Sequence, residues 1–545
     1  MVLVNTTSVD SGLAMTTALA VVTYLWFKHY EPTDIVSLSV LLGFTPAIPA
    51  VLLGSPMSST VAAVLTAYTV HYGIILACIV AYRLSPFHPL YKYPGPLLGK
   101  LSKLTLVYVA STGKQHHYFL RMHRKYGSIV RVGPNELSIV DAELLPNIMG
   151  PDGMPKGPLW KGRQIGGKKG SANTHPKGTL INARDKGVHA ENRRVWNRAF
   201  TSSAVKRYEP TVIRLASQLV DELKKRCSAD AQQENAVDLS QWLSFFSFDF
   251  MGDFVFGGPF ELLTEGDKNG LVHTVESGLY PTALIQHIPW CVGAVVNLPF
   301  VAKQMKGLGM FAYTQTLRRL QAGSVHDDLF YHLADEAGLE KQRPTVPYLI
   351  SNMVTAIIAG SDTTAVALTA AFCLLASHPT CYARLQVEID EAFPPHESEP
   401  TDTAKMAQLP YLNAIINETL RLHPPGATSL QRAPTEGSGG HMLGRQIFIS
   451  EGTAVYSPPY RWIEKDHNPN IILNTDAFMP FSTGPANCVG RPLALIEMRM
   501  VLVYVLRAFD LRLKDGFDAE RWREDLRDLF VTIRGPLLVV LTPRH

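Results

Sequence analysis

The sequence predicts a mainly α-helical protein with small β-sheets, in which one large domain follows a group of N-terminal transmembrane helices. Charged residues make up 18% of the 545 residues, yet residues 1–82 contain only four of them. Apolar residues recur at helical spacing through most of the remaining chain, and only short stretches alternate in the manner of strands. The 46% of hydrophobic residues excludes a disordered protein, and a formal net charge of +4 gives no indication of a nucleic-acid partner.

Residues 1–82 are predicted to form a membrane region with up to three transmembrane helices. The three apolar runs are Gly12–Phe27, Ile35–Gly54 and Thr60–Tyr82, and a transmembrane helix needs about 20 residues. No basic residue precedes the first run, which disfavours a cleaved signal peptide. Two arrangements fit the pattern: either all three runs span the bilayer, or only the third does and the others lie in the interface. No later segment is a charge-free span, which argues against a polytopic transporter.

Residues 83–100 are predicted to form a proline-rich elbow. Pro94-Gly95-Pro96 cannot continue a helix and should bend the chain as it leaves the membrane. Basic residues follow the membrane runs, at Lys28, Arg83, Lys92, Lys100 and Lys103. The positive-inside rule places these positions, and with them the rest of the chain, on the cytosolic side.

Residues 101–545 are predicted to form one mostly helical domain, because no repeat or low-complexity linker divides them. Helical patterns cover residues 211–226, 346–377, 380–392, 409–422 and 491–508, and strand patterns cover 128–132, 136–140 and 446–449. Two further apolar stretches, Leu529–Ile533 and Leu537–Leu541, flank Arg534-Gly535-Pro536 and are predicted to pair as a terminal hairpin. The glycine- and lysine-rich stretch 153–187 is predicted to be a loop.

The segment with the clearest chemistry contains a cysteine between glycines. It reads Phe481-Ser-Thr-Gly484-Pro-Ala-Asn-Cys488-Val-Gly490, and an apolar helix begins at Arg491. Free N–H groups at a helix N-terminus stabilise a thiolate, and glycines allow the backbone to approach a flat cofactor. A thiolate on haem iron favours cleavage of the O–O bond of bound dioxygen. An isolated cysteine in this setting is more often an inert core residue, so the interpretation of Cys488 as a haem ligand depends on the other motifs.

The pattern FxxGxxxCxG around Cys488 resembles the haem-binding loop of the cytochrome P-450 family. Ala359-Gly360-Ser361-Asp362-Thr363-Thr364 resembles the oxygen-activation motif of that family, and Glu418-Thr-Leu-Arg421 resembles its ExxR motif. The three motifs occur in the family's order behind a membrane region and a proline elbow, and the resemblance covers residues 90–545. The chain looks similar to fungal microsomal members, which implies a cytochrome P-450 fold with a single haem-thiolate domain and haem b as cofactor.

The resemblance also implies roles for individual residues. Cys488 is expected to be the axial ligand of the haem iron, and the other cofactor-binding positions are Phe481, Gly484, Gly490, Ala359 and Gly360. Asp362 beside Thr363 can relay protons to dioxygen. Ala359 and Thr363 are four residues apart, so they share one face of a helix.

Charged residues outside the motifs complete the expected site. Glu418 and Arg421 share a helix face and are expected to form a structural ion pair, which Arg461 would join. The haem propionates are expected to meet His189 and Arg193, in a predicted helix over 189–200, and Arg432. Ala486 stands where the family usually has Arg or His, so one propionate contact is missing.

The stretch between the ExxR helix and the haem loop departs from the family. Glu451–Tyr460 resembles the strand before the family's meander and Arg461-Trp462 resembles the end of its PERW element. About 15–20 intervening residues are missing at 458–462 by this analogy, a size of gap that only ordinary surface loops tolerate. A skipped exon, an error in the gene model and a decayed enzyme all explain the shortening.

The resemblance implies a monooxygenase that inserts one atom of dioxygen into a lipophilic small molecule, with a role in secondary metabolism. The substrate pocket is expected to be lined by residues 153–187, the helix face Val354–Thr363, and residues near Ala427–Gln431. No flavin or nicotinamide domain is present, so an NADPH–cytochrome reductase at the endoplasmic reticulum membrane is the expected electron donor. Basic residues that could dock it are Arg194, Arg198, Lys206, Arg207 and Arg499. The alternatives are a haem-thiolate isomerase and an impaired or haem-free protein.

Overall fold

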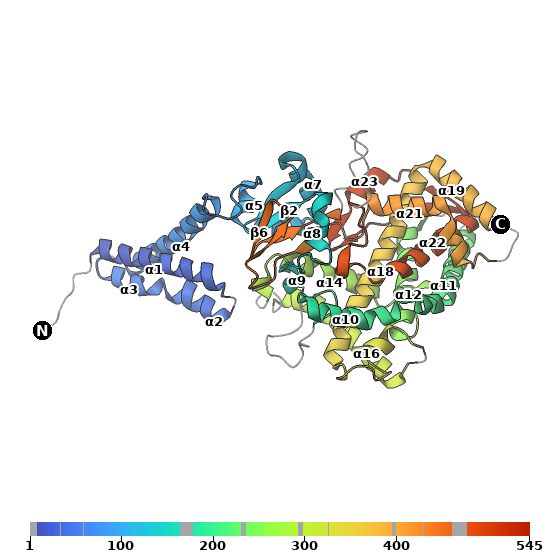
Figure 1. Ribbon diagram of the computed structural model, residues 1–545, viewed down its shortest axis with the longest axis horizontal. Coiled ribbons are helices and arrows are strands. Elements are labelled where there is room, and N and C mark those ends of the chain that lie inside the picture. Colours follow the sequence, from blue (N-terminus) through green and yellow to red (C-terminus); the bar gives the residue numbers. More distant parts are fainter. Residues whose placement is uncertain are drawn as a thin grey trace. The chain divides into compact units, whose positions relative to one another are not determined.

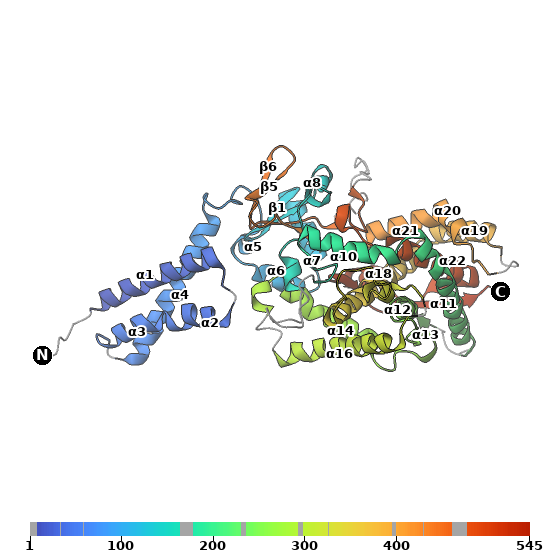
Figure 2. The same ribbon diagram turned by 60° about the horizontal axis from the view of Figure 1, so that its bottom comes forward.

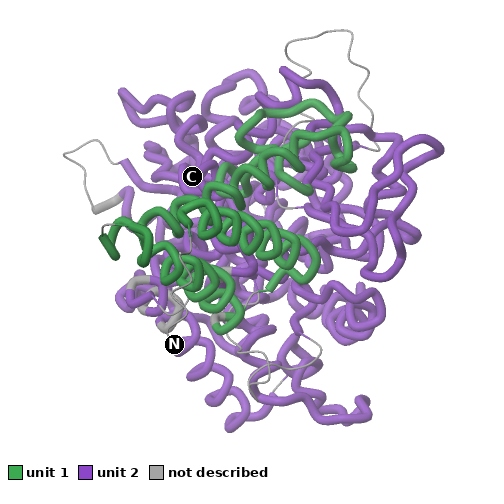
Figure 3. The backbone as a smooth tube through the Cα atoms, turned by 90° about the vertical axis from the view of Figure 1, so that its left-hand side faces the viewer, with its two compact units in different colours: residues 1–105, 131–135 green, residues 106–130, 136–545 purple. Residues whose placement is uncertain are grey.

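The structure is a computed structural model, and it describes residues 8–32, 34–57, 59–163, 178–229, 236–292, 298–324, 326–394, 399–428, 430–459 and 477–544 (Figure 1). The chain divides into two compact units. Unit 1 comprises residues 1–105 and 131–135, and unit 2 comprises residues 106–130 and 136–545 (Figure 3).

Unit 1 contains the apolar helices of the N-terminal region. Its helices are α1 (Val9–Tyr30), α2 (Ile35–Leu38), the π-helical turn η1 (Ser39–Phe44), α3 (Ala47–Gly54), α4 (Thr60–Leu84) and α5 (Leu97–Leu101). The segments Val9–Tyr30, Val36–Gly54 and Thr60–Leu84 are long and apolar enough to cross a membrane, and they coincide with the three predicted runs. Gly12 allows α1 to approach α3, because a Cβ there would lie 2.5 Å from Leu53 Cδ2. The N-terminal region is therefore suited to membrane association.

The elbow in unit 1 is built around the buried side chain of Arg131. Arg131 is 1% exposed and donates to the backbone oxygens of Arg83 (2.9 Å) and Pro134 (2.9 Å). Its backbone N–H donates to Pro94 O, and a Cβ on Gly95 would lie only 2.0 Å from Arg131 O. Glycine between the two prolines therefore allows the elbow to close on this arginine.

Unit 2 is mostly helical and is organised around α18 (Val346–Ser377), which runs through its middle (Figures 1 and 2). The helix begins with a proline in its first turn and packs along α12 (Leu239–Phe256) and α16 (Pro299–Ala322). By length and composition alone α18 resembles a membrane span, but 72% of its most apolar window is buried. It is the central core helix of unit 2.

The other helices of unit 2 surround this core. They are α6 (Leu104–Ser111), α7 (Gln115–Tyr126), η2 (Ala142–Leu144), α8 (Leu145–Met149), α9 (Leu159–Gly162), α10 (Lys186–Ala199), α11 (Ser202–Ala229), α13 (Leu262–Glu265), α14 (Leu271–Ile285), η3 (Pro289–Cys291), α17 (Leu329–Leu333), α19 (Pro379–Ala392), α20 (Thr403–Gln408), α21 (Pro410–Leu422), η6 (Gly484–Ala486), α22 (Arg491–Ala508) and α23 (Ala519–Glu524).

The strands form four small sheets within the described residues. They are β1 (Ile129–Gly133), which is divided between the units, β2 (Glu136–Ile139), β3 (Ala236–Asp238), β4 (Gln431–Arg432), β5 (Gly440–Leu443), β6 (Ile447–Ser450), β7 (Ala454–Tyr456), β8 (Phe509–Leu513), β9 (Arg527–Leu529), β10 (Val531–Ile533) and β11 (Leu538–Pro543). In unit 2, β7 pairs in parallel with β2 and antiparallel with β4, while β11 lies antiparallel between β3 and β8. The fold is mainly α with small sheets, as predicted.

The predicted C-terminal hairpin is wrong. Residues 529–533 contain a tight turn of their own, in which Leu529 pairs with Val531 across Phe530, and 538–543 pair instead with β3 and β8. Arg534 explains the separation, because its partly buried side chain donates to Ser244 and to Thr369 (3.2 Å) and so directs the chain away from β10.

Candidate functional site

The loop from Phe481 to Gly490 has a backbone that depends on glycine. Gly484 has φ +70°, and a Cβ there would lie 1.9 Å from Met149 O at the end of α8. Cys488 N–H donates to Phe481 O (2.8 Å), which closes the loop just before α22. The loop is therefore a tight turn held against α8, as the motif predicts.

Cys488 as a residue is exposed to solvent, although protein atoms surround its thiol group closely. Burial raises the pKa of the thiol, while the N–H groups of Gly490 and Arg491 and the charge of Arg193 act in the opposite direction. These donors and cations are the groups that stabilise a thiolate at a helix N-terminus.

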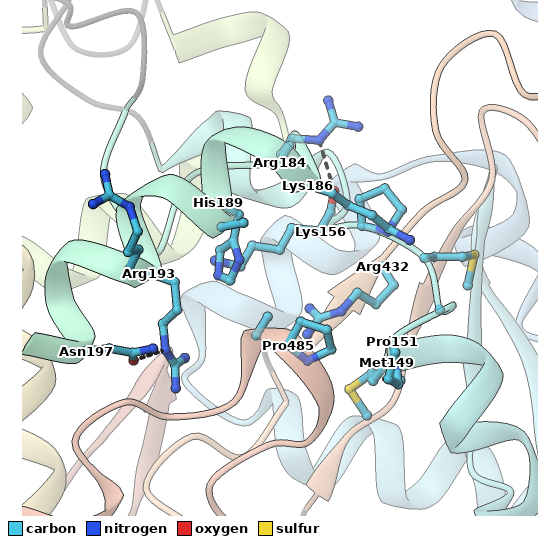
Figure 4. A pocket seen from close by; sticks show the side chains of 17 residues that line it. Met149, Pro151, Lys156, Arg184, Lys186, His189, Arg193, Asn197, Arg432 and Pro485 are labelled. Carbon is cyan, nitrogen blue, oxygen red and sulfur yellow. Dashed lines mark hydrogen bonds between the residues drawn. The ribbon is translucent and has the colours of Figure 1, made fainter. Parts of the chain in front are cut away.

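A cationic pocket of about 450 Å³ adjoins this loop (Figure 4). Its lining includes Pro485 and Ala486 of the loop and the side chains of Lys156, His189, Arg193 and Arg432, which come from three other parts of unit 2. None of the described residues that line the pocket is Asp or Glu. A pocket with several cations and no carboxylate favours an anionic group.

The expected propionate residues meet in this pocket. Arg193 donates to the backbone oxygen (2.5 Å) and to the side-chain oxygen (2.7 Å) of Asn487, which fixes α10 to the haem loop. Arg432 is 3% exposed, and burial lowers its pKa to about 10, so it remains charged. Burial and the nearby cations lower the pKa of His189 to about 4. His189 therefore acts as a neutral N–H donor rather than as a cation.

Lys156 is a member of this cluster that sequence reasoning missed. Its side chain is buried and donates to the backbone oxygens of Leu180 and Ile181, both at 2.8 Å. Lys156 also forms an isolated β-bridge with Arg432, which pairs the backbones of the two residues, and burial together with the charges of Arg432 and Arg193 holds the pKa of Lys156 well below its ordinary value. It lies in the segment 153–187 that was predicted only as a loop, and no local pattern marks it.

The oxygen-activation motif lies in the middle of α18, where its residues face different neighbours. Ala359 is exposed in the middle of α18, and Thr363, one turn later, donates to Ala359 O (2.6 Å). Asp362 is 1% exposed, and its carboxyl oxygens have no hydrogen-bond partner among the described residues. Burial raises the pKa of Asp362 to about 7, and Arg534 partly opposes this effect. Such a carboxyl group gives up and regains a proton near neutral pH.

Gly360 has a packing role in this structure. A Cβ at this position would lie 2.3 Å from Met251 Sδ, so the glycine allows α12 to approach α18. The expected contact of Gly360 with the cofactor stays a prediction.

The ExxR motif forms the expected ion pair. Arg421 donates to both carboxylate oxygens of Glu418, at 2.7 and 2.6 Å, within α21. Arg461 and the shortened segment beyond Pro459 lie outside the described residues, so Arg461 as the third member stays a prediction.

Most of the expected docking cations are already engaged. Arg194 and Arg198 both pair with Glu340, at 2.6 and 2.8 Å, and Arg207 lies 3.6 Å from Asp327. Arg499 donates to Asn413 (2.8 Å). The positive charge of this surface is thus lower than the sequence suggests.

The residues of the site fit a haem group. The tight turn at Gly484 presents the Cys488 thiol, and the adjoining cationic pocket suits two propionates. Ala359 and Thr363 add an exposed face on a core helix, where a flat ring can approach the backbone.

Comparisons with known proteins agree with this chemistry. The family model described as Cytochrome P450 matches residues 89–539. Cytochrome P450 monooxygenase FCK2 of Fusarium pseudograminearum is 32% identical over 492 residues, which cover 86% of this chain and 85% of the relative. Tryprostatin B 6-hydroxylase of Aspergillus fumigatus is 31% identical over 500 residues, with 86% and 84% covered. Cytochrome P450 67 of Uromyces fabae is 31% identical over 550 residues, with 95% and 97% covered. The chain is a haem-thiolate monooxygenase and belongs to the cytochrome P450 family.

Proposed function

We propose that this protein hydroxylates a lipophilic small molecule at the endoplasmic reticulum membrane, with electrons from an NADPH–cytochrome reductase. The membrane association of the apolar N-terminal segments supports a substrate that partitions into lipid. The observation that carries the proposal is the tight turn at Gly484 beside a pocket whose described lining contains several basic residues and no carboxylate, which supports Cys488 as a haem ligand.

The residues of the site then have separate tasks. Haem supplies the activation of dioxygen when it is bound at Cys488. Arg193 and Arg432 hold the propionates by charge, and Lys156 and His189, whose pKa values are lowered by burial and by the nearby cations, hold them as N–H donors.

Asp362 and Thr363 of the motif in α18 deliver the protons. The Thr363 hydroxyl lies on the exposed face of the helix and donates to Ala359 O, so a small rotation can turn its proton toward a ligand. Asp362 lies on the buried side, where its raised pKa lets it supply protons to this hydroxyl through water at neutral pH.

The test is the carbon monoxide difference spectrum of the reduced, full-length protein in membranes. We expect the red-shifted Soret band of thiolate-ligated haem in the wild type, its loss in Cys488→Ser and its retention in the control Cys381→Ser. Absence of the band in the wild type would support the impaired or haem-free alternative. Turnover without reductase would support the isomerase alternative.

A further inference from the structure

A chain of buried polar side chains connects several segments of unit 2 on one side of α18. Gln115 donates to Thr428 Oγ1 (3.0 Å) and accepts from His287 Nε2 (3.0 Å), and Thr428 donates to Asp528. Gln286, next to His287, accepts from Arg163 Nη2. Apart from Arg163, each of these side chains is at most 3% exposed. The two ends of this series of hydrogen bonds carry opposite charges, Arg163 and Asp528.

Arg163 is the cation of this network. Its guanidinium carbon lies 3.4 Å from the centroid of the Phe530 ring and 5.4 Å from that of Trp160. Its buried Nε has no hydrogen-bond partner within the part of the chain that the structure describes. Burial lowers the pKa of Arg163 to about 9, so the group stays charged at neutral pH.

Asp528 acts on the positive charge of Arg163 only through electrostatic attraction. Its carboxylate accepts from Thr428 and from the N–H of Phe530 (3.3 Å), whereas its effect on Arg163 is electrostatic without a hydrogen bond. Burial also raises the pKa of Asp528, which weakens the counter-charge. A buried guanidinium with a free donor favours an additional acceptor.

The backbone of Phe530 is strained in the conformation that stacks its ring against the guanidinium of Arg163. Its φ is +90°, a region that aromatic residues rarely adopt and that tends to occur at functional sites. Two neighbouring hydrogen bonds hold the turn, from Asp528 N–H to Gly113 O (2.7 Å) and from Thr532 N–H to Pro425 O (2.9 Å). The turn is therefore fixed from both sides.

The stack of Arg163 on Phe530 lies at the wall of α18 that leads to the oxygen-activation motif. Phe530 packs in one apolar cluster with Ile358, the residue before Ala359, and with Val366. Arg163, Ile358 and Thr428 belong to the three segments that the sequence predicted to line the substrate pocket. The hydrogen-bond network joins the segments of Arg163 and Thr428, and Phe530 packs against the same apolar cluster as Ile358 of the remaining segment.

We propose that Arg163, stacked on Phe530, is the polar anchor of the substrate pocket and selects lipophilic substrates that carry a carboxylate. This inference rests on the proposed function, because it places the anchor near the part of α18 that carries the oxygen-activation motif. The planar guanidinium offers Nε and a neighbouring N–H to the two oxygens of a carboxylate. The rings of Phe530 and Trp160, which meet edge to face with centroids 5.7 Å apart beside the guanidinium, would contact the apolar part of the molecule.

The experiment compares acids with their neutral esters. Full-length holoprotein in detergent is titrated with dodecanoate and methyl dodecanoate, and with 2-naphthylacetate and its methyl ester. Binding is followed by the shift of the haem Soret band and, independently of haem, by the fluorescence of Trp160, assigned by comparison with Trp160→Phe. We expect the wild type to prefer each acid about tenfold, since hydrogen bonds between charged groups supply that difference.

The variants separate the anchor from general effects of charge. Arg163→Gln should abolish the preference for acids, whereas Lys161→Gln should keep it, because Lys161 is exposed and pairs with Glu436 at the surface. Asp528→Asn leaves Arg163 in place and removes its distant counter-charge, so it should raise the affinity for acids several-fold. An equal acid-to-ester ratio in the wild type and Arg163→Gln would overturn the proposal.

Two further outcomes are decisive. If Arg163→Gln does not fold, an unchanged acid-to-ester ratio in Asp528→Asn would overturn the anchor. If the wild type shows no thiolate-type carbon monoxide band, the proposed function fails, while the fluorescence titration still decides whether Arg163 binds carboxylates.

Discussion

Asp362→Asn should change how the stability of the protein depends on pH. The native pKa of about 7 lies above the ordinary value of 3.8, because the carboxyl group is buried. The native state therefore keeps a proton that the unfolded chain releases at lower pH. The stability that this proton confers is fully present below pH 3.8 and is lost as the pH rises through 7.

The magnitude follows from the distance between the two pKa values. At roughly 1.4 kcal/mol per pKa unit, this difference corresponds to at most about 4.5 kcal/mol of stability, most of it lost between pH 4 and pH 7. Asparagine has nearly the same shape and does not titrate. The difference in unfolding free energy between Asp362→Asn and the wild type should therefore grow with pH and level off above pH 7, with the variant more stable.

The assay is urea unfolding of the detergent-solubilised protein at several pH values from 5 to 8, followed by circular dichroism. The difference between two proteins is needed, because buried neutral histidines such as His423, whose pKa is lowered to about 4, change the stability with the opposite sign. Asp515→Asn is the matched control, since Asp515 is 73% exposed. A difference that stays constant from pH 5 to pH 8 would refute the protonated, buried carboxyl group. The variant should also lose coupling between NADPH oxidation and product formation.

Three further predictions concern the haem site and the ExxR ion pair. Gly484→Ala should abolish haem incorporation, measured as haem per protein, because the new Cβ would overlap Met149 O and the backbone has φ +70°; normal haem content would contradict the tight turn. Arg432→Gln should speed the transfer of haem to apomyoglobin by about tenfold, since one charge-assisted contact is lost; an unchanged rate would exclude Arg432 from the propionates. Arg421→Gln should lower the thermal midpoint more than Glu418→Gln, because the side chain of Arg421 is 8% exposed and that of Glu418 is 53% exposed; equal effects would contradict this asymmetry.

Local sequence signals located the helices that carry the site. The predicted ranges 346–377 and 491–508 coincide with α18 and α22, because a proline in the first turn marks the start of each helix. The expected cofactor ligand also needed only a local motif, since the glycines around Cys488 define a turn whatever lies beyond it.

Contacts between distant segments were not predictable. Lys156 joins the cationic pocket only because its strand-like segment meets Arg432, far along the chain. The partners of β11 are equally remote, and the short distance from 533 to 537 suggested a hairpin that the contacts of Arg534 prevent. The buried position of Asp362 depends on packing around α18 and not on the motif itself.

The contacts of the haem loop bear on the shortened segment that precedes it. Within the described residues, Gly484 meets Met149 of α8, and Arg193 of α10 donates twice to Asn487. Neither contact involves residues 460–476, which lie between β7 and the loop. Because α8 and α10 supply these contacts, shortening the preceding segment leaves them in place around Cys488. The missing residues should therefore lower the stability of the holoprotein more than they change the ligand of the iron. A wild-type protein that binds haem weakly, yet still gives the thiolate-type carbon monoxide band, is the outcome expected from this arrangement.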